Sequence, residues 1–208
     1  MGIEARRKRE RLERRNAILR AALEAYEHEG YYATTMEKIA ERAEFSRATL
    51  YLYFKTKDEI FVHAIVSRSD YFGDLLEDLY KRRKSARDHL IDELWWIFKK
   101  YYDEEPVSFS AILYFHQSEM VRNLSEPLRL LIYRSGARNV SLMHKIAAYG
   151  IKEGLFRKCN PKTLAEVIWT SFLGIVQLEN SKAILSRKTH MEITRDLAVE
   201  VLKKGIGV

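Results

Sequence analysis

The chain of 208 residues contains a single cysteine, Cys159, so an intrachain disulfide cannot form. Proline and glycine are scarce, with 3 and 9 residues, and this favours long helices over a many-turned all-β fold. No apolar run approaches the roughly 18 residues of a membrane-spanning helix, so neither a membrane span nor a membrane partner is expected. With no disulfide framework and no apolar leader, the sequence predicts a cytoplasmic protein.

Patterns that would indicate an enzyme, a cofactor or a metal are missing as well. No spacing joins a nucleophile to a base and an orienting group, and neither a glycine-rich phosphate loop nor a metal-ligand motif is present. A weaker alternative is a metal site at which His144 faces His116 and Glu119. We expect hydrogen-bonded or exposed histidines instead, and therefore no catalysis, no cofactor and no metal.

Positive charge, by contrast, is abundant and concentrated at the start of the chain. The formal net charge is +7, and residues 1–20 carry eight basic against three acidic side chains, a net +5. Such a basic arm suits a polyanion, either nucleic acid or an anionic membrane, and the alternative is a solvated tail. Large apolar residues are almost absent before Leu12, which makes membrane anchoring poor.

Apolar residues at helical spacing predict a compact bundle of four helices within the first 70 residues. Capping residues mark where the individual helices are expected to begin or end. They are Gly30 after a first helix of about 11–29, Thr34 with Glu37 before the second, Ser46 before a third over about 47–54, and Thr56 with Glu59 before the fourth.

Longer helices are predicted beyond the charge run 81–84, and no strand pattern is present. The fold class is therefore all-α, with about nine helices in total. The later helices are expected at about 90–102, 108–122, 126–153, 161–185 and 189–204.

Residues 35–54 have the pattern of a helix-turn-helix, in which a helix of two turns, a tight turn and a second short helix follow one another. Small side chains at Ala40 and Ala43 allow the two backbones to approach closely, and larger apolar residues lock their angle. The outer face of the third helix is then free to enter the major groove of DNA.

A characteristic set of residues runs through this segment and the turns around it: Gly30, Thr35, Ile39, Ala40, Ala43, Phe45, Ser46, Thr49, Leu50, Tyr51, Phe54 and Lys57. In these positions the sequence resembles the tetracycline-repressor (TetR) family of transcriptional regulators. The family often has glycine where Glu44 and Ala48 stand, and a polar residue where Leu52 stands, so these positions bear on which bases are read.

The resemblance implies an N-terminal three-helix helix-turn-helix domain, residues 1–68 with the basic arm, that binds double-stranded DNA. A larger helical bundle, residues 69–208, would bind an effector and dimerise. The implied DNA contacts are Thr35, Tyr51 and Lys57 on phosphates, Arg47, Thr49, Ala48 and Leu52 on base edges, and Ser46 and Tyr53 supporting the helix or reaching the backbone. Core packing is the alternative for the two tyrosines and the preferred interpretation for Phe54.

The larger bundle is rich in aromatic residues, most of which are expected to form ordinary core. The resemblance implies that some of them surround a small-molecule pocket, apolar with a few polar anchors. The candidate lining residues are Trp95, Phe98, Tyr102, Phe115, Met120, Met143 and Trp169, with Arg138, Ser141 and His144 as anchors.

The last two helices present apolar stripes that suit a two-fold four-helix interface, although intrachain core is the alternative. The candidate interface residues are Leu164, Ile168, Ser171, Gly174, Ile175, Leu178, Ile193, Leu197 and Val201.

Together these features predict a DNA-binding transcriptional regulator, a homodimeric repressor released from a palindromic operator by a small, mainly lipophilic ligand. A dimer would place two recognition helices on half-sites about 34 Å apart. The alternative is a regulator of the same fold without a small-molecule effector, which is controlled by a partner or is constitutive.

Overall fold

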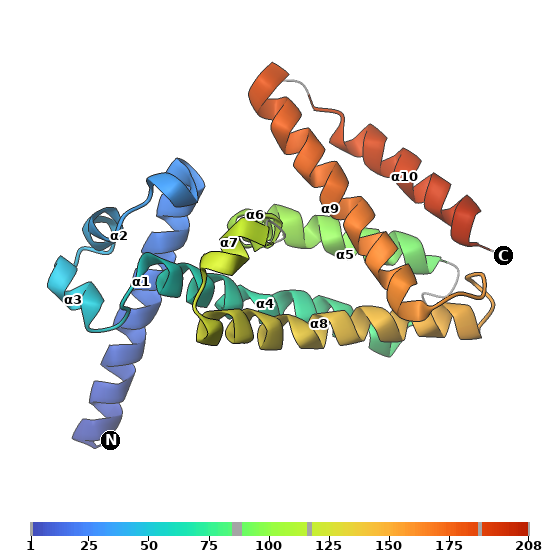
Figure 1. Ribbon diagram of the computed structural model, residues 1–208. Coiled ribbons are helices and arrows are strands. Elements are labelled where there is room, and N and C mark those ends of the chain that lie inside the picture. The colour runs from blue at the N-terminus through green and yellow to red at the C-terminus, as the bar shows by residue number, and fades with distance from the viewer. Residues whose placement is uncertain (1, 85–88, 116–117, 187–188, 208) are drawn as a thin grey trace. The chain divides into compact units, whose positions relative to one another are not determined.

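The computed structural model describes residues 2–84, 89–115, 118–186 and 189–207, and this part of the chain forms ten α-helices (Figure 1). The helices are α1 (Ile3–Ala33), α2 (Met36–Arg42), α3 (Arg47–Tyr51), α4 (Lys57–Arg82), α5 (Leu90–Glu104), α6 (Pro106–Phe115), α7 (Ser118–Asn123), α8 (Glu126–Lys152), α9 (Pro161–Ser186) and α10 (Met191–Ile206). Within those ranges the extended contacts amount to one isolated bridge, between Phe156 and Gly207. The predicted all-α fold is confirmed.

Two compact units make up the chain. Unit 1 combines the residues up to 69 with residues 107–134, and unit 2 combines residues 70–106 with those from 135 onward. The helices α4 and α8 therefore contribute residues to both units. The expected division into a DNA-binding part and an effector-binding part stays a prediction, because the division into compact units does not show which residues bind DNA or an effector.

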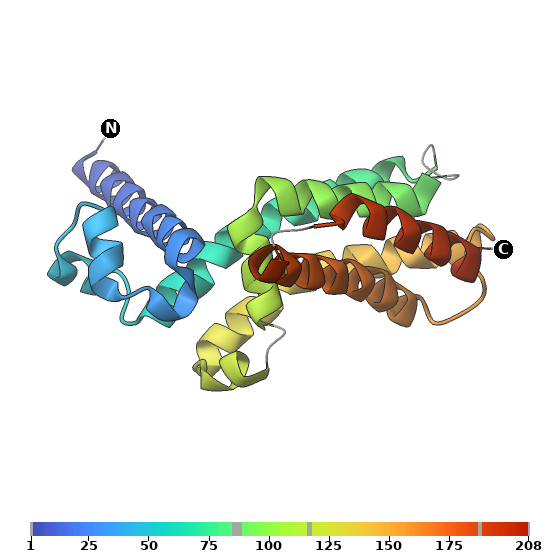
Figure 2. The same cartoon turned by 90° about the horizontal axis from the view of Figure 1, so that it is seen from above.

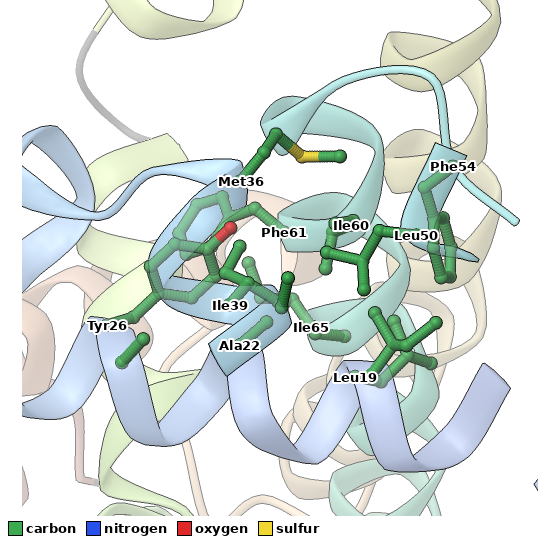
Figure 3. Packing of buried hydrophobic residues seen from close by; sticks show 14 residues of the cluster. Leu19, Ala22, Tyr26, Met36, Ile39, Leu50, Phe54, Ile60, Phe61 and Ile65 are labelled. Atoms are coloured by element: carbon green, nitrogen blue, oxygen red, sulfur yellow. The ribbon is translucent and has the colours of Figure 1, made fainter. Parts of the chain in front are cut away.

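One hydrophobic cluster holds unit 1 together, and it joins α1, α2, α3 and α4 (Figure 3). Leu50, the inward residue of α3, is fully buried in it, together with Ile39 of α2 and Ile60 of α4. Val107, from the start of α6, packs against the same cluster. Burying a side chain of this size contributes about 1.5–3 kcal/mol, so a few such residues fix a helix as short as α3.

The basic arm is part of a helix, which corrects the expectation of a separate arm before a helix at about 11–29. α1 begins at Ile3 and runs through the basic segment as one long helix (Figure 1). Residues 4–10 are strong helix formers, and Arg6 pairs with Glu10 one turn later at 2.8 Å. Apolar periodicity missed this segment because a fully exposed helix has no apolar face.

Near its C-terminal end α1 is kinked at Gly30, which has φ 77° and ψ 165°. Only glycine adopts this conformation without a steric penalty. The left-handed cap expected at Gly30 is not found, because its ψ lies far from the left-handed helical region. The helix resumes for Tyr31–Ala33 instead of stopping.

The N-cap of α2 is Thr35, and the prediction of Thr34 is wrong by one residue. The Thr35 hydroxyl accepts a hydrogen bond from the backbone N–H of Lys38 at 3.3 Å. Thr34 is fully buried and donates its hydroxyl to the Gly30 carbonyl at 2.8 Å. Two adjacent threonines offer the same capping group, and the kink at Gly30 decides which of them is buried.

The caps of α3 and α4 are those predicted. Ser46 accepts a hydrogen bond from the Thr49 N–H at 3.1 Å, and Thr56 accepts one from the Glu59 N–H at 3.1 Å. The Glu59 carboxylate accepts in return from the Lys55 N–H at 2.6 Å. Glu59 therefore bonds to the residue before the cap and not to the N–H of Thr56 itself, which a full capping box would pair. Both bonds satisfy N–H groups at a helix start.

Two further helix boundaries also differ from the prediction. α3 ends at Tyr51 rather than near Phe54, because the chain tightens into a turn in which the Tyr53 N–H donates to the Leu50 carbonyl at 2.9 Å. The helix expected at 108–122 begins at Pro106 and is described as α6 and α7, on either side of residues 116–117.

The core of unit 2 is a set of aromatic rings on α4, α5 and α9. The Phe98 ring lies 4.9 Å from that of Trp169 and 5.5 Å from that of Phe172, measured between ring centres. The Trp95 ring meets Phe172 edge-on at 5.4 Å. α9 and α10 lie side by side in both views (Figures 1 and 2), and α10 also contacts α5.

Candidate nucleic-acid interface

The turn between α2 and α3 fixes the angle of the two helices. Glu44 has φ 56°, the left-handed conformation that glycine usually supplies. The turn is closed by the Glu44 N–H, which donates to the Glu41 carbonyl at 3.1 Å, and by the Phe45 N–H, which donates to the Ala40 carbonyl at 2.9 Å. A non-glycine residue therefore serves this turn, as the sequence indicated, and its carboxylate is exposed.

α3 has one buried face and one face open to solvent. Leu50 is 0% exposed, whereas Leu52, directly after the helix, is 76% exposed. The open face is formed by Arg47, Ala48, Tyr51 and Leu52, all of which are exposed. α3 is thus a short helix that is anchored by Leu50 and whose outer side chains are exposed.

Three exposed side chains form a network across α2 and α3, which we call the Arg47 network: Glu37, Arg47 and Tyr51. One guanidinium nitrogen of Arg47 lies 2.6 Å from a Glu37 carboxylate oxygen. Another donates to the Tyr51 hydroxyl at 3.3 Å, and the guanidinium lies 5.6 Å from the centre of the Tyr51 ring. Two side chains expected to contact DNA are therefore already oriented in the free protein.

Glu37 sits in the first turn of α2, where unpaired N–H groups favour a negative charge. Its own backbone N–H, the Thr35 side chain and Arg47 hold the pKa of the Glu37 carboxyl below its ordinary value. From the sequence Glu37 was expected only as a capping residue. No spacing rule relates it to Arg47, because the tight turn between them sets their distance.

Lys57, expected to contact a phosphate, is half-buried at the start of α4. Its amine donates to the Tyr31 carbonyl at 2.9 Å and lies 4.4 Å from the centre of the Tyr31 ring. Burial lowers the pKa of Lys57 from its ordinary value. The Tyr31 hydroxyl donates to the Asp58 carboxylate, and the Tyr26 hydroxyl donates to the Lys57 carbonyl at 3.2 Å. The end of α1 thus holds the start of α4.

The remaining predicted DNA contacts are placed as follows. Thr35 and Ser46 are exposed helix caps, and the Thr49 hydroxyl, which is half-buried, lies 2.8 Å from the Ser46 hydroxyl. Tyr53 is half-buried and packs against the core of unit 1. Phe54 is core, as expected, with the Arg15 guanidinium 5.1 Å and the His63 ring 5.8 Å from its ring centre.

Most of the expected ligand-lining residues are packed in the core of unit 2. Trp95, Phe98 and Met143 are buried there, and Trp169 is half-buried against Phe98. The Tyr102 hydroxyl donates to the Asn180 side chain at 3.0 Å. The structure therefore brings the expected rings together as a packed cluster.

The expected polar anchors do not converge on these rings as unpaired groups. Arg138 forms ion pairs with Asp74 and Glu77. Ser141 is exposed, and His144 is half-buried. The side chains of Phe115 and Met120 lie outside the described part of the chain, as do those of His116 and Glu119, so the alternative metal site is not described.

An open groove of about 470 Å³ lies between α5 and α10, and the sequence did not indicate it. Trp95 and Trp96 of α5 line it, and Arg195, Val199 and Lys203 lie on the opposite side. Asp92 also lines it, and its carboxylate forms an ion pair with Lys203 at 2.6 Å. The groove arises where α10 packs on α5, a pairing that no local pattern in the sequence reveals.

Two of the expected dimer-interface residues are buried within the single chain, and the interface as a whole stays a prediction. Leu164 is 5% and Ile168 is 2% exposed, because both pack into the core of unit 2. The others lie at or near the surface: Ser171 and Ile175 are half-buried, and Gly174, Leu178, Ile193, Leu197 and Val201 are exposed. The three candidates on α10 recur every fourth position and form one apolar stripe.

Among the described residues, no helix is long and apolar enough to span a membrane. The same residues contain no group of three potential metal-ligating side chains.

Comparison with known proteins gives matches in sequence and in fold. Residues 18–64 match the family model described as "Bacterial regulatory proteins, tetR family". The HTH-type transcriptional regulator YfiR of Bacillus subtilis (strain 168) is 29% identical over 177 residues, which cover 79% of this chain and 78% of that protein. The fatty acid metabolism regulator protein of the same organism is 32% identical over 73 residues, 35% of this chain and 38% of that protein.

Among solved structures, the transcriptional regulator FadR from Bacillus subtilis in complex with stearoyl-CoA superimposes with a TM-score of 0.66. The match covers 91% of this chain and 98% of that one at 21% identity, so the likeness is one of fold. The helix order expected from the sequence is therefore found along almost the whole length of a solved protein.

Proposed function

The chain is a member of the TetR family of bacterial regulatory proteins, and from this we propose that it is a dimeric repressor, released from a palindromic operator by a small, mainly lipophilic ligand. That family consists of transcription regulators and is not a family of enzymes. The expected cytoplasmic location stays a prediction.

One observation carries the proposal: α3 is anchored by the fully buried Leu50 while Arg47, Ala48 and Tyr51 face solvent. The major groove of B-DNA admits an α-helix, and its base edges offer acceptors to arginine and methyl groups to apolar side chains. A helix whose position is fixed before binding loses little conformational freedom when it enters the groove.

We assign base contacts to Arg47, Thr49, Ala48 and Leu52. Arg47 would bond to guanine in the bidentate manner, and the apolar Ala48 and Leu52 would contact thymine methyl groups. Thr49 would have to share its hydroxyl with Ser46, which it faces at 2.8 Å.

We assign phosphate contacts to Thr35, Tyr51 and Lys57, with Ser46 and Tyr53 supporting the helix or reaching the backbone. Lys57 has three N–H donors, one of which bonds to the Tyr31 carbonyl, so two remain for a phosphate. The Tyr31 contact would then position the amine instead of competing with DNA.

A second copy of the chain would cover the apolar stripe of α10, formed by Ile193, Leu197 and Val201, together with Leu178 of α9. Exposed apolar residues in register on neighbouring helices are typical of a four-helix interface. Gly174 is exposed on α9 with nothing within 4 Å of where a Cβ would stand, which leaves room for a close-packed partner helix.

A lipophilic effector would match the apolar chemistry of the aromatic core of unit 2, in which Trp95 and Phe98 both meet Phe172 and Phe98 meets Trp169. The FadR structure with stearoyl-CoA is an example of the same fold with an acyl ligand. Such a ligand would release the operator only if it binds the DNA-incompetent arrangement more tightly, since equal affinity for both arrangements shifts nothing.

The test is retention of the protein on duplexes selected from a random pool, followed by titration of stearoyl-CoA and of free stearate. We expect a palindromic consensus, salt-sensitive binding and release by at least one of the lipids. The Tyr51→Ala/Lys57→Ala double variant should bind more weakly with unchanged helicity. Absence of any selected sequence would reject the function itself.

The tight packing of Trp95 and Phe98 also favours a second candidate, a regulator of the same fold that responds to a protein partner or is constitutive. Both rings are almost fully buried, so an effector there would require the helices to move. Sequence-specific DNA binding that no lipid alters, with no small molecule retained in native mass spectrometry, would support this alternative.

A further inference from the structure

We propose that Glu37 is a specificity-determining residue, which holds Arg47 away from DNA phosphates until the correct base pair is offered. The inference rests on the proposed binding of DNA through α3. It concerns a residue that lies on the supporting helix α2 rather than on the recognition helix.

The geometry of the Arg47 network supports this role. The Glu37 carboxylate and the Arg47 guanidinium are 2.6 Å apart, and Arg47 also donates to the Tyr51 hydroxyl at 3.3 Å. Glu37 and Arg47 are each more than half exposed, so neither is held by packing and both can be reached by DNA. Arg47 therefore has an alternative partner next to the surface that meets the duplex.

An exposed ion pair is weak, so DNA can break it. The bonds that Arg47 gains in exchange differ from one DNA site to another. On an incorrect sequence Arg47 is offered single phosphate oxygens, and these must compete with a carboxylate already in place. On the correct site guanine O6 and N7 accept two parallel hydrogen bonds, which is a better exchange. Glu37 would thus lower non-specific affinity more than specific affinity, and specificity is the difference between the two.

The chain offers a matched control on the same helix. Glu41 lies one turn after Glu37, is exposed, and forms no ion pair within the described part of the chain. Each glutamine substitution removes one negative charge from an exposed position of the same helix. A difference between Glu37→Gln and Glu41→Gln therefore reports the contact with Arg47, not the net charge.

The experiment measures binding of wild type, Glu37→Gln and Glu41→Gln to the selected operator and to a scrambled duplex, over a range of salt concentrations. For Glu37→Gln we expect about fivefold tighter binding to scrambled DNA than for Glu41→Gln, with little difference on the operator. The salt slope on scrambled DNA should steepen by about one further phosphate contact. Selection from a random pool should give a weaker base preference at one position of each half-site.

A double-mutant cycle completes the test. In the Arg47→Ala background, Glu37→Gln and Glu41→Gln should have the same effect, because the partner of Glu37 is gone. Equal effects of the two glutamine variants in the Arg47 protein would overturn the inference. If wild type itself selects no sequence, the proposed function fails instead, so the two failures are distinguishable.

Discussion

At the scale of single residues, Glu44 has a backbone conformation that residues with a side chain rarely adopt. A residue other than glycine adopts the left-handed conformation at a cost of roughly 1–2 kcal/mol, and Glu44 has φ 56°. The bonds that close the turn at Glu41 and Ala40 hold it there. The folded protein is therefore less stable than it would be with glycine at position 44, the residue that the TetR family often has there.

Glu44→Gly should raise the free energy of unfolding by about 1 kcal/mol, measured by urea denaturation followed by circular dichroism. Glu41→Gly is the matched control, since the same substitution inside α2 should lower stability by about 1 kcal/mol. Destabilisation by both variants would mean that the turn is not strained at Glu44.

His63 makes stability depend on pH near neutrality. Burial and the neighbouring Arg15 charge lower the pKa of His63, only partly offset by Glu59. The unfolded chain therefore takes up this proton at a higher pH than the folded chain does. The contribution of His63 is present above about pH 6.5, the ordinary pKa of histidine, and is lost as the pH falls through the lowered pKa.

Between pH 7.5 and 5.5 the urea midpoint should accordingly fall, and His63→Gln should reduce that fall. His28 is exposed on α1, so His28→Gln serves as the control and should leave the pH dependence unchanged. The carboxyl groups with lowered pKa, such as Glu93, act below this window. An undiminished fall in the His63 variant would rule out its role.

At the scale of helices, the sequence was informative where a boundary depends on local chemistry. Ser46 and Thr56 cap helices as predicted, because a hydroxyl before a helix bonds to an N–H three residues on. The boundary was missed where tertiary structure decides: the kink at Gly30 buries Thr34 and leaves Thr35 as the cap. The start of α1 was missed because its exposed turns lack the apolar period used to find helices.

The candidate site divides in the same way. The outward side chains of α3 could be predicted from the helix-turn-helix pattern, which fixes Leu50 as the buried residue. The partners of those side chains could not. Glu37 reaches Arg47, and Lys57 reaches Tyr31, through the folded arrangement of separate helices, and no spacing in the sequence encodes either contact.

The helical start of α1 gives the basic residues a defined direction. Arg15 is fixed against the Phe54 ring, and residues 6–9 lie about two turns before it, roughly 9–14 Å away along the helix. A rigid basic helix next to the recognition segment would add phosphate contacts beside the operator.

Replacement of Arg6, Arg7, Lys8 and Arg9 by glutamine should lower DNA affinity and make the salt slope shallower by about 0.9 for each phosphate that the protein no longer neutralises. Helicity should persist, because glutamine is a good helix former. The matched control is the replacement of Lys152, Arg157, Lys158 and Lys162, four exposed basic residues of unit 2. Equal slopes for the two variants would mean that α1 itself does not touch the DNA backbone.

At the scale of the whole molecule, the proposed dimer depends on the apolar stripe of α10. Leu197 lies in the middle of that stripe and is exposed in the single chain. A charge that is buried without a partner at such an interface destabilises the dimer, because it loses its hydration and also removes the apolar packing of the side chain it replaces.

Leu197→Glu should therefore give monomers in native mass spectrometry and weaken operator binding about 100-fold or more, since two linked half-site contacts become one. Thr163→Glu adds the same charge at the exposed first turn of α9 and should leave the dimer intact. A dimeric Leu197→Glu protein would show that another surface joins the two copies.

The contact of Val107 with the core of unit 1 has a practical consequence for protein engineering. Residues 107–134 belong to the same compact unit as α1, α2 and α3, although they follow α4 and α5 in the chain. In a fragment that ends at residue 68, the core residues that Val107 covers would be exposed to water. Transfer of the helix-turn-helix domain to another protein would therefore require either residues 107–134 as well or a polar substitution among the core residues that Val107 covers.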